Sequence, residues 1–97
     1  MGTTKKMNLD AIKGIMSAKS ITAFGFQEDE ANPVKFSVEF CGRRHVVNGI
    51  CILDNGLLEV EIYPRNDSSS CFRVLAAELS VDALETIFCV MSELLPL

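Results

Sequence analysis

The chain begins and ends with segments in which apolar residues recur at the spacing of an α-helix. Residues 8–19 start with Asn8, a candidate N-cap, and present one apolar face at Leu9, Ile12, Ile15 and Met16. In the C-terminal segment Ser80 is a candidate N-cap, and Pro96 ends the pattern. The apolar stripe of this second segment comprises Val81, Leu84, Ile87, Phe88, Met91, Leu94 and Leu95. The spacing therefore predicts one helix at each end of the chain.

Between these helices, apolar residues recur at every second position, which is typical of half-buried β-strands. The alternation is clean over 34–41 and 57–63, and shorter runs at 22–26 and 72–76 predict two further strands. Residues 44–53 are apolar on both faces and form one more strand, the third along the chain. The pattern predicts an α+β fold with the order α-β-β-β-β-β-α, a five-stranded antiparallel meander with both helices on one face.

Two glycine-containing turns indicate which face of the strand over 44–53 points toward the helices. The Asn-Gly pair at 55–56 predicts a two-residue type I′ hairpin loop, which pairs Cys51 with Val60. A two-residue loop at 42–43 places Val47 on the same face as Cys51. Both turns therefore direct the side chains of Val47 and Cys51 toward the helices.

The same registers leave the opposite sheet face uncovered and partly apolar. Ile50 and Ile52 are expected to point away from the helices, with Glu59 and Glu61 at the border of the patch. An apolar centre with a charged rim is typical of protein interfaces. The predicted interface residues are Val46, Ile50, Ile52, Leu57, Glu59, Glu61 and Tyr63.

Three occupants of this face are open at this point. The first helix, or the N-terminal tail with Met7, could fold over it. A second copy of the chain could pack sheet to sheet, since twofold homodimers are the commonest assemblies. The third occupant is a different protein.

The length of 97 residues fits one domain spanning 1–97, of which we expect residues 1–7 to be flexible. With 13 acidic and 9 basic residues, the formal net charge of −4 argues against an electrostatic nucleic-acid binder. Weak nucleic-acid binding remains an alternative, through the basic residues Lys5, Lys6, Arg43 and Arg44.

The segment Cys41-Gly42-Arg43-Arg44-His45 concentrates groups that could carry chemistry. A thiolate at Cys41 would be favoured by the neighbouring arginines, with His45 as its base. In the predicted hairpin, however, Cys41 and His45 lie on opposite faces of the sheet. A ligand or enzyme pocket near His45, between helix and sheet, is therefore kept as an alternative.

Neither a metal site nor a cofactor site is predicted. Cys41 and His45 have a plausible spacing for ligands, but no second ligand pair follows at the distance found in zinc fingers. The chain contains neither a dinucleotide-binding glycine pattern nor a P-loop. Glu59 and Glu61 lie at a distance that suits an acid–base pair, yet alternating Glu on an exposed strand is commonly a solubility feature.

The sequence shows no membrane-spanning run and no signal peptide, so we expect a cytoplasmic protein with reduced cysteines. Together these features predict a small non-enzymatic interaction module of the adaptor or inhibitor type. It would form a homodimer or bind a partner protein through the uncovered sheet face.

Overall fold

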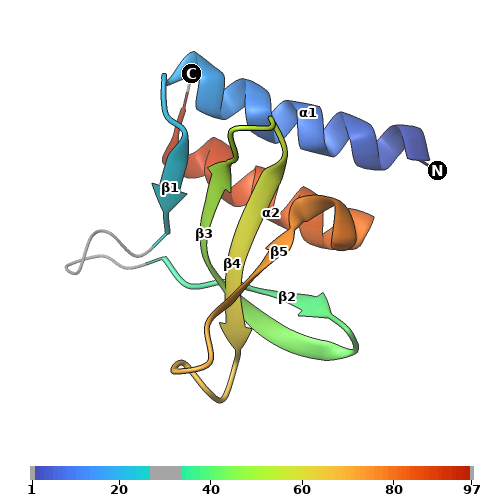
Figure 1. The fold of residues 1–97 in the computed structure, drawn as a ribbon, viewed down its shortest axis with the longest axis vertical. Helices are drawn as coiled ribbons and strands as arrows, with labels where there is room; N and C mark the ends of the chain where they lie inside the picture. Colours follow the sequence, from blue (N-terminus) through green and yellow to red (C-terminus); the bar gives the residue numbers. More distant parts are fainter. Residues whose placement is uncertain (1, 27–33, 97) are drawn as a thin grey trace.

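The computed structural model describes residues 2–26 and 34–96 and confirms the α+β class. Five strands form one antiparallel sheet, with a helix at each end of the chain, in the predicted order (Figure 1). The elements are α1 (Gly2–Ala18), β1 (Ala23–Gly25), β2 (Ser37–Phe40), β3 (Arg43–Ile52), β4 (Leu58–Pro64), β5 (Phe72–Leu75), the 3₁₀ turn η1 (Ala76–Glu78) and α2 (Val81–Leu94).

Helix α1 begins at Gly2, earlier than the predicted start, so Asn8 lies inside the helix and is not its N-cap. Residues 2–7, which we expected to be flexible, form its first turns. They contain no proline, and lysine and methionine are good helix formers. The predicted apolar face is correct, since Ile12 and Met16 are fully buried.

Helix α2 has the N-cap that the sequence predicts. The hydroxyl oxygen of Ser80 accepts a hydrogen bond from the Ala83 N–H at 3.1 Å, which satisfies one of the free donors of the first turn. The apolar stripe packs inward, and Leu84, Ile87 and Met91 are fully buried. The C-terminal helix is therefore held by a local cap and by a wide apolar face.

The loop between β2 and β3 consists of Cys41 and Gly42, one residue earlier than predicted. Both residues have positive φ, 52° and 78°, as a type I′ loop requires. Val38 lies opposite His45 in the resulting register. This register differs from the predicted one by an even number of residues, so His45 and Val47 point toward the core as expected.

The loop between β3 and β4 has three residues, 54–56, where two were predicted. Across this loop the Leu53 N–H donates to the Leu57 carbonyl oxygen at 2.8 Å. Gly56 has a φ of 85°, the left-handed conformation that ends a three-residue hairpin loop. An asparagine–glycine pair suits both kinds of loop, so the dipeptide alone does not determine the loop length.

The longer loop reverses the two faces of the second half of β3. Ile50 pairs with Val60 and Cys51 pairs with Glu59. Ile50 is 3% exposed in the core and Ile52 packs against the core, so the prediction that both isoleucines point away from the helices is wrong. Burial of an isoleucine side chain contributes about 1.5–3 kcal/mol, more than burial of a small side chain such as cysteine, and this favours the observed register.

A β-bulge in the middle of β3 reverses the faces a second time. The register shifts between Val47 and Gly49, so Asn48 is an extra residue. On the N-terminal side of the bulge, Val46 lies opposite Tyr63 on the face away from the helices, as predicted. Both side chains are nevertheless buried, with 9% and 7% exposure.

Strand β1 pairs with β3 and not with β2, so the strands do not follow one another across the sheet as in a simple meander. Phe24 lies opposite Ile50, and Gly25 lies opposite Gly49. The ten-residue β3 thus accepts both short strands, β2 and β1, besides β4. A Cβ atom on Gly49 would lie 3.1 Å from the Phe24 carbonyl oxygen, so a larger residue there would have to push β1 slightly away.

Both helices cover the same face of the sheet, as predicted, and α1 packs beside α2 (Figure 1). The core contains Ile12 and Met16 of α1, Leu84 of α2, and Val47 and Val60 of the sheet. Within residues 2–26 and 34–96, neither helix is long and apolar enough to cross a membrane.

Candidate functional site

The sheet face opposite both helices, which we call the open face, collects most of the charged side chains of the strands. Its membership follows from the strand pairing and from the bulge at Asn48. The open face comprises Ala23, Gly25, Lys35, Ser37, Glu39, Arg44, Val46, Asn48, Gly49, Cys51, Glu59, Glu61, Tyr63, Arg73 and Leu75, with Arg65 just after β4.

A depression of about 390 Å³ lies on one half of the open face, over β1, β3, β4 and β5. Ala23, Gly25 and Gly49 contribute little or no side chain there, so the backbone lies open beneath the longer polar groups. We call it the acidic depression. It is lined by Ala23, Phe24, Gly25, Asn48, Gly49, Ile50, Cys51, Glu59, Glu61 and Arg73.

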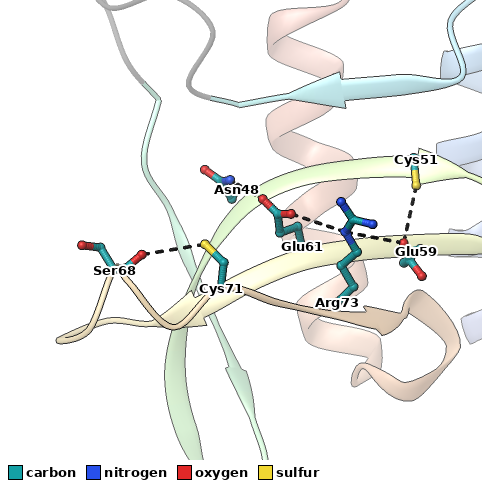
Figure 2. A network of polar contacts seen from close by, with 7 residues as sticks. All are labelled: Asn48, Cys51, Glu59, Glu61, Ser68, Cys71 and Arg73. Carbon is teal, nitrogen blue, oxygen red and sulfur yellow. Dashed lines mark hydrogen bonds and ion pairs between the residues drawn. The ribbon is translucent and has the colours of Figure 1, made fainter.

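Two carboxylates of this depression share one guanidinium group (Figure 2). The Nε of Arg73 lies 3.4 Å from an oxygen of Glu61 and 3.9 Å from an oxygen of Glu59. The amide of Asn48 donates a hydrogen bond to Glu61 at 2.5 Å. The arginine side chain is 67% exposed, whereas the side chain of Glu59 is 23% exposed and that of Glu61 is 32% exposed. The carboxylates are thus held in place while their cation faces solvent, and two negative charges oppose one positive charge.

The thiol of Cys51 belongs to the same network, with its Sγ 3.9 Å from an oxygen of Glu59 (Figure 2). Burial and the negative charge of Glu59 raise the pKa of this thiol above its ordinary value, and Arg73 opposes the change. The thiolate is the nucleophilic form of cysteine, so the network makes Cys51 less reactive than a free thiol. This arrangement does not favour a nucleophilic role for Cys51.

A second depression, of about 430 Å³, lies on the other half of the open face. The buried side chains of Val46 and Tyr63 form part of its floor, and Lys35 and Arg65 are exposed at its border. The full lining is Lys35, Phe36, Ser37, Val46, Tyr63, Arg65 and Ser68.

A third basic residue lies next to this second depression. The N–H of Arg65 donates to the carbonyl oxygen of Arg44 at 3.1 Å, which brings the two arginines together. We call Lys35, Arg44 and Arg65 the cationic end. None of the three makes an ion pair within residues 2–26 and 34–96, where both ion pairs involve Arg73. Glu39 lies opposite Arg44 in the β2–β3 register, and Asp67 follows Arg65 in the neighbouring loop, so the described residues of this end carry three positive charges and two negative ones.

The loop from β4 to β5 borders the cationic end and is held by its own side chains. Asp67 accepts hydrogen bonds from the hydroxyls of Ser69 and Ser70 at 2.7 and 2.6 Å, and these bonds hold its pKa below the ordinary value. The Sγ of Cys71 lies 3.8 Å from the Ser68 carbonyl oxygen (Figure 2). The Asp67 carboxylate is therefore engaged within the loop.

The predicted interface residues separate into three groups. Ile50 and Ile52 belong to the helix-covered side, so the expected apolar centre of the open face does not form. Leu57 is 47% exposed and lies beside the β3–β4 loop. The remaining four do lie on the open face: Val46 and Tyr63 buried at one end, and Glu59 and Glu61 in the acidic depression.

The contacts of His45 are those of a packed side chain. It is 5% exposed, its Nδ1 lies 3.0 Å from the Arg43 carbonyl oxygen, and its ring meets the rings of Phe40 and Phe72 edge-on. Cys41, by contrast, is exposed in the β2–β3 loop. The alternative of a pocket near His45 therefore gains no support from these contacts.

One basic residue of the nucleic-acid alternative lies beside acidic ones. Lys5 shares a depression with the Cys41–Gly42 loop, but Glu39 and Glu78 line the same depression. Two carboxylates against one ammonium group do not favour a phosphate backbone. The stronger cationic grouping, on the open face, shares only Arg44 with that alternative; Lys35 and Arg65 were not predicted from the sequence.

Asn48 is the residue whose role the sequence analysis missed. Its signal was the glycine that follows it inside a strand, since such a glycine often marks a bulge. Within residues 2–26 and 34–96, no group of three or more His, Cys, Asp and Glu side chains could hold a metal ion.

The chain matches no protein-family model, no curated protein and no solved structure.

Proposed function

We propose that this protein is a small, non-enzymatic interaction module that binds a protein through its open face. One observation carries the proposal: the face opposite both helices holds two charged depressions, of about 390 and 430 Å³, and neither α1 nor α2 packs over them. In the first depression Arg73 and Asn48 hold the carboxylates of Glu59 and Glu61, which gives a partner a fixed pattern of charge to meet. Whether the module acts as an adaptor or as an inhibitor depends on its partner.

The basis of recognition differs from the one that the sequence suggested. Because the two isoleucines are in the core, the face offers charge and shape rather than an apolar centre. Charged groups at an interface govern specificity and the rate of association more than affinity. The module therefore suits a partner whose surface carries complementary charges.

The chemical groups of the chain support a binding role over catalysis. The imidazole of His45 contacts the rings of Phe40 and Phe72, and burial and Glu59 raise the pKa of the Cys51 thiol. The paired carboxylates Glu59 and Glu61 already share Arg73. Each group that could act as a base or a nucleophile there is engaged in a structural contact.

Site-specific photo-crosslinking in the cells of origin tests this proposal. A benzoylphenylalanine side chain is placed at Ala23 or Ser37 on the open face, and at Thr86 on the exposed side of α2 as the control. We expect both open-face positions to form adducts with one protein, identified by mass spectrometry, and the helix position to form none. The proposal is overturned if Thr86 captures the same protein, or if Ala23 and Ser37 capture nothing.

A further inference from the structure

We infer that the occupant of the open face is a second copy of this chain, packed face to face about a twofold axis. This inference rests on the proposed function and names the partner. In the pair, the cationic end of each copy lies against the acidic depression of the other.

The first support is the division of charge on the open face. The cationic end holds Lys35, Arg44 and Arg65 against Glu39 and the neighbouring Asp67. The acidic depression holds two carboxylates against one arginine. The bulge at Asn48 separates the two groups, so one face presents a positive and a negative half.

A twofold axis turns this division into attraction. In a twofold interface, a contact from group i to group j is repeated as a contact from j to i. A face with charges of one sign would repel its own copy, whereas a face with two opposite halves meets its complement twice. The axis would cross the face near Asn48, between the two halves.

The second support is the shape of the two halves. Lys35 and Arg65 are long, exposed side chains without an ion pair among the described residues. The acidic depression is lined at its base by Ala23, Gly25 and Gly49, which leave room for an entering side chain. One half therefore projects cations and the other half receives them.

The experiment exchanges the charges of each half separately. One variant is Lys35→Glu/Arg65→Glu and the other is Glu59→Lys/Glu61→Lys. The matched control is Asp82→Lys/Glu85→Lys, which reverses two exposed charges on α2, away from the open face. Sedimentation equilibrium over a range of protein concentrations, at low and high salt, gives the dimer Kd, and circular dichroism checks each fold.

We expect the wild-type chain and the α2 control to form dimers that salt weakens, since screening reduces the attraction between exposed charges. Each open-face variant should raise the Kd by at least about tenfold, because it sets like charges against each other. Mixing the two open-face variants should restore a dimer that contains one chain of each, which native mass spectrometry resolves by mass.

A wild-type chain that stays monomeric at every concentration overturns the inference. So does a dimer that Lys35→Glu/Arg65→Glu leaves unchanged, or a failure of the two folded variants to associate when mixed. Where Glu59→Lys/Glu61→Lys does not fold, Glu59→Gln/Glu61→Gln replaces it and should also weaken the dimer. If the chain is monomeric while Ala23 and Ser37 still crosslink to another protein, only the inference fails and the proposed function stands.

Discussion

The two halves of the open face share strands β3 and β4 but are built on different supports. At the cationic end, the charged side chains stand around Val46 and Tyr63, which are nearly as buried as core residues. In the acidic depression, the charged side chains stand over glycines and alanine, and hydrogen bonds rather than apolar packing hold them. One half is therefore an apolar platform bordered by exposed cations, and the other is a polar recess whose carboxylates are held by hydrogen bonds and ion pairs.

This difference shows how a single bulge divides a sheet face. The extra residue at Asn48 lets β3 bury Val47 on one side of the bulge and Ile50 on the other. It also changes the spacing of the outward residues, so an apolar row is followed by a polar one. The three predictions that follow test this contrast, from the largest expected effect to the smallest.

The largest difference should separate Tyr63→Ala from Glu61→Ala, two changes on the same face of the same strand. Tyr63 is 7% exposed, so its truncation leaves a cavity and should cost about 3–5 kcal/mol of unfolding free energy. Glu61 is 32% exposed and its ion pair faces solvent, so its truncation should cost less than about 1 kcal/mol. Urea unfolding measures both values. Equal losses would show that the two halves are supported in the same way.

The glycine at the base of the acidic depression should be next in effect. A Cβ at position 49 would lie 3.1 Å from the Phe24 carbonyl oxygen, so Gly49→Ala must displace β1 and should cost about 1–3 kcal/mol. The control is Gly14→Ala in α1, where nothing lies within 4 Å of the new Cβ and a gain of about 0.5–1 kcal/mol is expected. Thermal unfolding measures the change in stability of both variants. A Gly49→Ala variant as stable as the wild type would contradict the close approach of β1.

The smallest effect concerns the reactivity of Cys51 within the carboxylate network. In a background with Cys41, Cys71 and Cys89 replaced by serine, the alkylation rate of Cys51 reports its titration. Because burial and Glu59 raise the pKa of this thiol above 9.0, the rate should rise only at a pH above that of an ordinary thiol.

Two variants identify the cause of this shift in the pKa of Cys51. Glu59→Gln removes a negative charge and should move the rate profile to lower pH, whereas Arg73→Ala removes a positive charge and should move it to higher pH. The raised native pKa also means that this thiol stabilises the fold below the pKa of the unfolded chain, and that the contribution is lost as pH rises through the native pKa. A profile that neither variant moves would exclude the electrostatic explanation.

The helices and the existence of the strands could be predicted from the sequence because they depend on local spacing. The Ser80 cap, the apolar stripe of α2 and the buried face of α1 follow from residues within a few turns of one another. The alternation over β2 and β4 likewise identified both strands. For the candidate site, this local information placed Glu59 and Glu61 correctly on the outward face.

The orientation of the second half of β3 could not be predicted from its turn alone. Two-residue and three-residue hairpin loops both accept Asn-Gly, and one residue of difference exchanges the faces. The isoleucines themselves held the missing signal, because a register that buries Ile50 and Ile52 is favoured over one that buries Gly49 and Cys51.

By itself, the sequence determined the elements, their order and the excess of negative charge. Only the tertiary structure decided that β1 joins β3, that a bulge forms at Asn48, and that Lys35, Arg44 and Arg65 gather at one end of the open face. These features depend on contacts between residues distant along the chain, and burial of the core selects among registers that the local turns leave nearly equal in energy.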